Sequence, residues 1–145
     1  YLRSVDSPED ETLVPNYYSV SAFSAAEFKE RFLAAYPEAD LSGDPAGWIR
    51  DIVRNESDYV ASLAVGGVVL RGNDLRMLLS LRSPAFTVDF SGDTFTFHVT
   101  GYGHGVGMSQ YGANAMAEAG ANFKEILAHY YTGAILLNYS EFVEE

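Results

Sequence analysis

The chain has 145 residues, of which 48% are hydrophobic and 20% charged, so it can bury a core and is not expected to be disordered. Its 9 Lys and Arg against 20 Asp and Glu give a formal charge of -11, which would repel a phosphate backbone and excludes nucleic acid as a partner. The sequence contains no cysteine, which excludes disulfides and thiolate chemistry, and no apolar run long enough to span a membrane.

The first elements are expected in the order strand, loop and helix. Residues 2–5 alternate like a short strand, and residues 7–11 form an acidic loop that contains a proline. The sequence Ser24-Ala25-Ala26-Glu27 has the pattern of a capping box. Apolar residues at helical spacing follow it, which predicts a helix from Ala25 to Tyr36 that ends before Pro37.

The middle of the chain predicts a loop, three strands and a second helix. Glycine and proline make residues 41–47 a loop, and residues 48–53 are expected to be extended. Residues 59–70 read as two strands joined by a turn at Gly66-Gly67. A helix is then expected from Gly72, with Asn73 as its N-cap, to near Leu81.

The last third predicts a hairpin followed by two helices. Residues 86–90 and 94–99 alternate around a tight turn at 91–93, and residues 109–119 read as a helix stopped by Gly120. Asn122 caps a further helix that ends before Gly133, and residues 134–139 are apolar and extended. The expected fold is therefore a single α+β domain over residues 1–145, with a mainly antiparallel sheet whose hairpins are packed by several helices.

The segment from Gly101 to Ala113 carries the strongest functional signal. It holds five glycines in thirteen residues, between a predicted strand and a predicted helix. Because glycine loses the most entropy on folding, this density indicates unusual φ angles or a close approach to a ligand. A tight structural crossover is the other interpretation. Nucleotide-binding loops are excluded, since no Lys-Ser or Lys-Thr pair follows the glycines and their strict alternation does not fit G-x-G-x-x-G.

Polar side chains in this segment favour a site, although each has a structural alternative. His104 can exchange a proton near neutral pH or can brace the loop through a backbone hydrogen bond. Ser109 can serve as a nucleophile or as a helix N-cap, and the absence of Gly-x-Ser-x-Gly disfavours the nucleophile. His98 and His129, the other two histidines, are expected in a core or an interface, and no spacing predicts a metal site or a cofactor.

Two stretches of this sequence resemble the sporulation protein D / LytB family. They are GYGHGVGMSQYGANAMAEAG with FKEILAHYYTGA, and GNDLRMLLSLRSPAF, which is similar to the family pattern G-x-x-L-R-x-x-L-x-L-R-S-x-x-F. The opening YLRSVDSPED also resembles the family, while agreement is looser between about residues 19 and 57. On this resemblance the chain is the C-terminal part of such a domain, with the upstream half absent.

The resemblance implies a peptidoglycan lytic transglycosylase, which cleaves glycan strands and leaves 1,6-anhydro ends. In the sporulation enzymes of the family, the substrate is a strand stripped of its stem peptides. The family's catalytic glutamate is expected upstream, so no residue of this chain is assigned a catalytic role and enzyme activity of the chain itself stays open. The alternative is a non-catalytic glycan-binding or amidase-enhancer module. The implied partners are glycan strands, cell-wall amidases or other sporulation hydrolases, and the upstream half. The implied location is outside the cytoplasm, in the cell wall or anchored to a membrane through an N-terminal segment.

The resemblance also implies a set of substrate-binding residues. Aromatic rings can stack on sugars, polar side chains can bond hydroxyl or N-acetyl groups, and guanidinium groups can bind a carboxylate or an oxyanion. A salt bridge with one of the many acidic residues is the alternative for both arginines. Five in-chain carboxylates could in principle replace the glutamate and none is favoured: Glu56, Asp58, Asp74, Asp89 and Glu118. The expected substrate-binding residues are Tyr102, His104, Ser109, Gln110, Tyr111, Arg76, Arg82 and Ser83.

Overall fold

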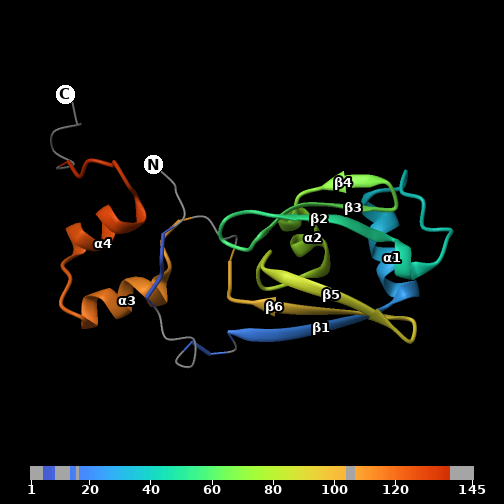
Figure 1. Cartoon of the computed structure of the whole chain (residues 1–145), viewed down its shortest axis with the longest axis horizontal. Coiled ribbons are helices and arrows are strands. Elements are labelled where there is room, and N and C mark those ends of the chain that lie inside the picture. The colour runs from blue at the N-terminus through green and yellow to red at the C-terminus, as the bar shows by residue number, and fades with distance from the viewer. Residues whose placement is uncertain (1–4, 9–13, 16, 104–106, 138–145) are drawn as a thin grey trace. The chain divides into compact units, whose positions relative to one another are not determined.

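A computed structural model of the chain describes residues 5–8, 14–15, 17–103 and 107–137. The chain folds into two compact units (Figure 1). The first comprises residues 16–105 and is called here the sheet unit. The second comprises residues 1–15 and 106–145 and is called the helical unit. Within the described residues, two antiparallel three-stranded sheets and four helices confirm the predicted α+β class.

The first sheet has the strand order β1-β6-β5, with all pairs antiparallel. Its strands are β1 (Tyr18–Ser24), β5 (Phe86–Ser91) and β6 (Thr94–Thr100). The hairpin of β5 and β6 confirms the predicted turn, and its two central residues, Gly92 and Asp93, have φ angles of 55° and 70°. Positive φ at both positions matches the right-handed twist of the two strands. The register places Phe86 opposite Val99 and Phe90 opposite Phe95.

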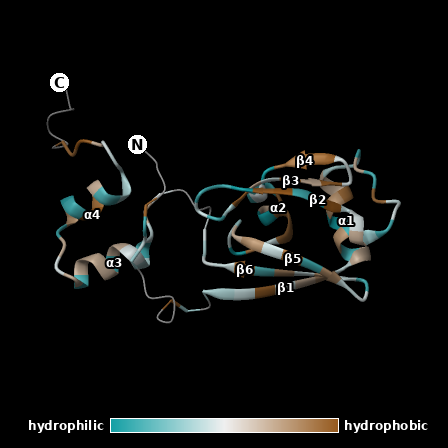
Figure 2. Ribbon diagram, in the orientation of Figure 1, coloured by the Kyte–Doolittle hydropathy of each residue, from teal (hydrophilic) through white to brown (hydrophobic). Residues whose placement is uncertain are grey.

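The second sheet has the order β2-β3-β4, and its strands are β2 (Ile49–Arg54), β3 (Val60–Val65) and β4 (Val68–Leu70). Gly66 and Gly67 form the β3–β4 turn with φ angles of 54° and 83°, as predicted. The edge strand β2 is irregular between Arg50 and Val53, where Asp51 has a φ of 53°. Figure 2 shows that hydrophobic and hydrophilic residues are interspersed along the strands of both sheets.

Strand β1 was not predicted, and its pattern explains why. Tyr18 and Val20 lie exposed on the solvent side, whereas Ser19 and Ser21 share the inner side with Phe23. The pairing of Ser21 with Phe97 and of Phe23 with Phe95 sets this register. In a strand that covers a core, apolar residues are expected on the inner face. The first apolar residues of β1 lie on the outer face instead, so the sequence pattern did not indicate a strand.

Helix α1 (Ala25–Ala35) begins as predicted and supplies the centre of the core. The Ser24 side chain accepts a hydrogen bond from the Glu27 N–H at 3.2 Å, which confirms the N-cap. Phe28 is fully buried, and its ring centroid lies 4.7 Å from that of Phe95 and 6.3 Å from that of Trp48. Trp48 follows the short 3-10 turn η1 (Pro45–Gly47) and directly precedes β2, so Phe28 packs between a strand of the first sheet and the residue that leads into the second.

Helix α2 (Gly72–Leu79) starts earlier than the predicted cap allows. Its N-cap is Arg71, which corrects the assignment of Asn73. The Asp74 carboxylate accepts hydrogen bonds from the Arg71 backbone N–H and guanidinium, so Asp74 satisfies the helix start in place of an N-cap side chain. Ser80 then closes the helix in the left-handed conformation, with a φ of 57°, and the helix stops short of Leu81.

The helical unit contains α3 (Gln110–Glu118) and α4 (Phe123–Tyr130). The Asn122 side chain accepts from the Lys124 and Glu125 N–H groups and Glu125 reaches back to the Asn122 N–H, which confirms the predicted cap. Near the start of the chain, the Ser7 hydroxyl bonds the Tyr130 hydroxyl at 2.8 Å. Residues 5–8 are therefore part of the helical unit and lie beside α4.

Some predicted extended segments are not strands. Residues 134–137 have no regular structure, and neither has Val5. Residues 2–4 and 138–139, which complete those predicted segments, lie outside the described residues. Within the described part of the chain, no helix combines the length and apolar character that crossing a membrane requires.

Gly72 tests the contact between α2 and β3. A Cβ atom at this position would lie 2.2 Å from the Val60 carbonyl oxygen, so Gly72→Ala must displace a helix or a strand. We expect a loss of about 1–3 kcal/mol in the free energy of unfolding, measured by urea titration. Gly43→Ala is the matched control, because no atom lies within 4 Å of its added Cβ, and it should change stability by less than about 0.5 kcal/mol. Equal stability of the two variants would contradict the close approach.

Candidate functional site

The start of the glycine-rich segment is held in place by backbone hydrogen bonds. Strand β6 ends at Thr100, after which the Gly101 N–H donates to the Tyr17 carbonyl at 2.7 Å and the Gly103 N–H donates to the Arg82 carbonyl at 2.9 Å. Gly101 and Gly103 have φ angles of 69° and 80°, which only glycine adopts at little cost. Two of the predicted glycines are therefore required by the backbone path.

The connection between α2 and β5 forms the other side of this arrangement. Ser83 is fully buried, and its hydroxyl donates to the Thr100 carbonyl while accepting from the Ala85 N–H at 3.1 Å. The Thr100 N–H donates in turn to the Ala85 carbonyl at 2.8 Å. Ser83 thus acts as a structural brace, which positions the neighbouring residues.

Arg82 and Tyr102 meet through their side chains. The Arg82 guanidinium donates from Nη1 to the Tyr102 hydroxyl at 2.7 Å, and its Cζ atom lies 5.1 Å from the centre of the tyrosine ring. The Tyr102 side chain remains 45% exposed. Arginine over an aromatic face is an attractive arrangement, so each side chain restricts the conformations of the other.

Arg76 joins this pair from the last turn of α2. Its Nε donates to the Arg82 carbonyl at 3.2 Å and its Nη1 donates to the Asn73 amide oxygen at 3.4 Å. Among the described residues no carboxylate lies within 4.0 Å of the Arg76 guanidinium, so the salt-bridge alternative finds no partner in this part of the chain. We call Arg76, Arg82, Ser83 and Tyr102 the arginine–tyrosine cluster.

The cluster offers binding chemistry. Two guanidinium groups can donate to carboxylate, carbonyl or hydroxyl oxygens, and an exposed phenol ring can contact the apolar face of a sugar. Its four side chains include no carboxylic acid. Four of the five carboxylates considered as replacements for the glutamate have local partners among the described residues. Asp74 binds Arg71, Asp89 lies 3.4 Å from His98 and Asp58 lies 3.6 Å from Arg54. Glu118 accepts a hydrogen bond from Asn114, and the fifth, Glu56, is exposed in a turn.

Three other predicted residues lie in the helical unit. Ser109 is the N-cap of α3, since its hydroxyl accepts from the Gly112 N–H at 3.1 Å. This geometry supports the N-cap interpretation over the nucleophile. Gln110 and Tyr111 are exposed in the first turn of the helix. His104 lies outside the described residues.

The two described histidines have local partners. His98 is exposed on the outer face of β6, and its Nε2 lies 3.4 Å from an Asp89 carboxylate oxygen. The Nε2 of His129 lies 2.7 Å from the Asp6 carbonyl oxygen, and its ring packs edge-on against Tyr130. The described residues contain no group of three His, Asp or Glu side chains that could hold a metal ion.

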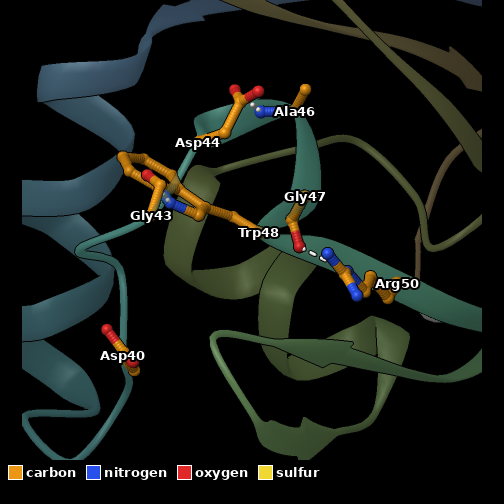
Figure 3. A pocket seen from close by; sticks show the side chains of 7 residues that line it. All are labelled: Asp40, Gly43, Asp44, Ala46, Gly47, Trp48 and Arg50. Carbon is orange, nitrogen blue, oxygen red and sulfur yellow. Dashed lines mark hydrogen bonds between the residues drawn. The ribbon is translucent and has the colours of Figure 1, made fainter.

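A surface hollow near η1 was not predicted (Figure 3). Its polar groups are engaged locally: the Asp44 carboxylate accepts from the Ala46 N–H, and the Arg50 Nε donates to the Gly47 carbonyl. The Asp40 carboxylate accepts from the Ser42 side chain and N–H, which lowers its pKa. These contacts are those of turn residues, and none points to a ligand.

The chain is similar over its whole length to the Stage II sporulation protein D of Bacillus amyloliquefaciens, with 39% identity over 146 residues that cover 40% of that protein. The protein of the same name from Bacillus subtilis is 38% identical over 92% of this chain and 37% of its own length. The Amidase enhancer of Bacillus subtilis is 43% identical over 46% of this chain and 10% of its own length. No family model matches the chain.

The matched region is only part of the first two relatives. The chain spans about two fifths of their length. The aligned region of the first relative spans the positions of the arginine–tyrosine cluster, because it covers 100% of this chain.

The ion pair at the start of α2 predicts a pH effect on stability. Hydrogen bonds from the Arg71 side chain lower the pKa of Asp74. Since the folded-state pKa lies below that of the unfolded chain, this contribution is present above about pH 4 and is lost as the pH falls through the folded-state pKa. Chemical unfolding should therefore show Asp74→Asn less stable than the unsubstituted chain at pH 7, with a smaller difference near pH 2. A difference that stays constant over this range would contradict the ion pair.

The brace made by Ser83 predicts a loss of stability in Ser83→Ala. This substitution leaves the Ala85 N–H and the Thr100 carbonyl without the hydroxyl, which should cost about 1–3 kcal/mol in urea unfolding. The exposed residue Ser91 gives the control Ser91→Ala, for which little change is expected. Hydrogen exchange should also accelerate at the Gly103 amide in Ser83→Ala, and unchanged exchange would show that Ser83 does not position this segment.

Proposed function

The chain belongs to the stage II sporulation protein D family and corresponds to a portion of its members, and from this we propose a function. The protein takes part in remodelling the bacterial cell wall during sporulation. The observation that carries the proposal is the similarity over the whole length of the chain. A cell-wall substrate implies that the protein works outside the cytoplasm, in the wall or attached to a membrane.

The proposed reaction is lytic cleavage of peptidoglycan glycan strands. Such a reaction requires a carboxylic acid that protonates the glycosidic oxygen and then assists attack of the sugar C6 hydroxyl on the anomeric carbon, which leaves a 1,6-anhydro end. The arginine–tyrosine cluster contains no such acid. The proposal therefore assigns the acid to a glutamate outside this chain, in the upstream portion of the domain, and assigns binding to the chain itself.

The cluster supports binding of a glycan strand. The Tyr102 ring is exposed and held in place by Arg82, so its conformational entropy is already reduced before a sugar arrives. The guanidinium groups can bond the oxygen atoms of the sugar and its N-acetyl group. The binding roles of His104, Ser109, Gln110 and Tyr111 stay predictions.

A second candidate function is a non-catalytic module that binds glycan or a cell-wall hydrolase. The similarity to an amidase enhancer, over 46% of the chain, favours this candidate. Its requirements are weaker, since binding needs the cluster but no proton donor. The partners that follow are cell-wall amidases or other sporulation hydrolases.

Product analysis separates the two functions. Glycan strands stripped of stem peptides would be incubated with this chain alone and with a longer protein that carries the upstream portion of the domain, and the products would be identified by mass spectrometry. Anhydro-ended products from the longer protein alone would support the lytic reaction. Glycan binding without products from either protein would support the binding module, and neither binding nor products would refute both.

The role of Tyr102 is tested by affinity. Tyr102→Ala removes the ring and should weaken binding of stripped glycan about three- to tenfold, as measured by isothermal titration calorimetry. Tyr18→Ala is the matched control, because Tyr18 is also an exposed tyrosine of the sheet unit but lies on β1, and it should leave the affinity unchanged. An equal loss in both variants would show that Tyr102 has no special role.

A further inference from the structure

The edge strands of the two sheets differ in how they are protected against pairing with a further strand. Proteins commonly block a free edge with charged residues, bulges, a short strand or a covering contact. Strand β4 has three residues, whereas β2 carries three charged residues and is irregular between Arg50 and Val53. The edge of β5 is engaged by Arg54, whose Nη2 donates to the Phe86 carbonyl at 2.6 Å. Each of these three edges therefore has a protecting feature.

Strand β1 is the remaining edge, and its sequence has none of these features. It is the outermost strand of the first sheet on the side of β6 away from β5 (Figure 1). Its seven residues, YSVSAFS, include no charge and no proline, and they pair with β6 in an unbroken register. The side chains of Tyr18 and Val20 are 66% and 63% exposed. A long, regular and uncharged edge of this kind is suited to accept another strand.

The hydrogen bonds to β6 determine which backbone groups of β1 face outward. The Tyr17 carbonyl accepts from the residue after β6, and the Ala25 N–H donates to the residue before β6. Bonded and non-bonded pairs alternate along an antiparallel ladder, so the even-numbered residues of β1 direct their N–H and C=O groups away from β6. No hydrogen bond within the described part of the chain uses these groups of Val20 or Ala22. Both residues can therefore pair with an added strand.

A second copy of the chain matches this edge. In an antiparallel pair with a twofold axis at Ser21, Val20 of one copy lies opposite Ala22 of the other, and Tyr18 lies opposite Ser24. Every outward-facing residue then meets another outward-facing one, which is the self-complementarity that a symmetric dimer requires. The chain has a formal charge of -11, so two copies repel each other, but pairing through β1 places no like charges opposite one another.

We propose that two copies of this chain associate by antiparallel pairing of their β1 strands, which joins the two first sheets into one sheet of six strands. The inference goes beyond the proposed function, because the surface is a sheet edge and not the arginine–tyrosine cluster. The exposed apolar area at Tyr18 and Val20 is small for an interface, and the charge of -11 opposes association. The expected dissociation constant is therefore about 10–100 µM.

Sedimentation equilibrium measures this association directly. The chain would be studied over about two decades of concentration around the expected dissociation constant, at low and at high salt. We expect a monomer–dimer equilibrium without larger species, because each chain offers a single free edge of this kind in its described part. Added salt screens the repulsion between the two acidic chains, so it should tighten the dimer about threefold. An association made by salt bridges would weaken instead.

Hydrogen exchange measured residue by residue identifies the paired strand. The amides of Val20 and Ala22 face outward, so they should exchange about tenfold more slowly at concentrations where the dimer forms. The amides of Ser19 and Ser21 are already bonded to β6 and should change less. This alternating pattern distinguishes strand pairing from contact through side chains alone.

A charge on the edge should prevent the pairing. Val20→Lys introduces a side chain of the kind that natural edge strands use against association, and it should weaken the dimer at least about tenfold. It also reduces the net negative charge by one, so general repulsion cannot account for the loss. Val69→Lys is the matched control, because Val69 is 75% exposed on the short edge strand β4, and its dissociation constant should stay within about twofold.

A second variant acts on the backbone. Ala22→Pro removes an outward-facing N–H and no hydrogen bond to β6, and proline is tolerated on an edge strand whose N–H faces solvent. It should also weaken the dimer at least about tenfold. Circular dichroism melts establish that each variant is folded, and Ala22→Pro decides the question if Val20→Lys does not fold.

Three outcomes would overturn the proposal. The first is a chain that stays monomeric over the whole concentration range, and the second is an undiminished dimer in the folded edge variants. The third is slow exchange of Val20 and Ala22 in a longer protein that carries the upstream portion of the domain, but at no concentration of this chain alone. That result would assign the edge to the upstream portion in place of a second copy.

Discussion

The sheet unit depends on the burial of one aromatic side chain, Phe28 of α1. Its ring contacts Phe95 of β6 and Trp48, which directly precedes β2, so a single helix position connects the first sheet with the segment that leads into the second. Burying a phenylalanine removes a large apolar area from water, and close packing makes the cost of removing it high. Phe95 lies near the start of β6, so this contact anchors the strand whose last residue is Thr100.

The end of β6 is where the two sequence signatures come together. The connection that follows α2 runs beside Thr100, and the buried hydroxyl of Ser83 joins them. Arg76 and Arg82 come from one signature and Tyr102 from the other. The arginine–tyrosine cluster is therefore a product of the antiparallel hairpin of β5 and β6, which returns the chain to the level of the α2–β5 connection.

Local signals were sufficient for most helices and hairpins. Ser24 and Asn122 cap helices through contacts with residues two or three positions away, and Gly66-Gly67 determines a two-residue turn. Strand β1 was missed because the first apolar residues that mark it face solvent, and only pairing with β6 determines its orientation. The meeting of Arg82 and Tyr102, 20 residues apart, likewise requires the tertiary fold, although the resemblance had named both residues.

The bond between Gly103 and Arg82 has a consequence for how this family can change. It joins a backbone N–H to a backbone carbonyl, so the side chain at position 82 takes no part in it. Substitution at that position can therefore alter what the surface binds while the chain path after β6 stays the same. A scaffold that separates backbone support from ligand contacts lets new specificities arise by single substitutions with little loss of stability, which makes this surface a suitable starting point for selection or design.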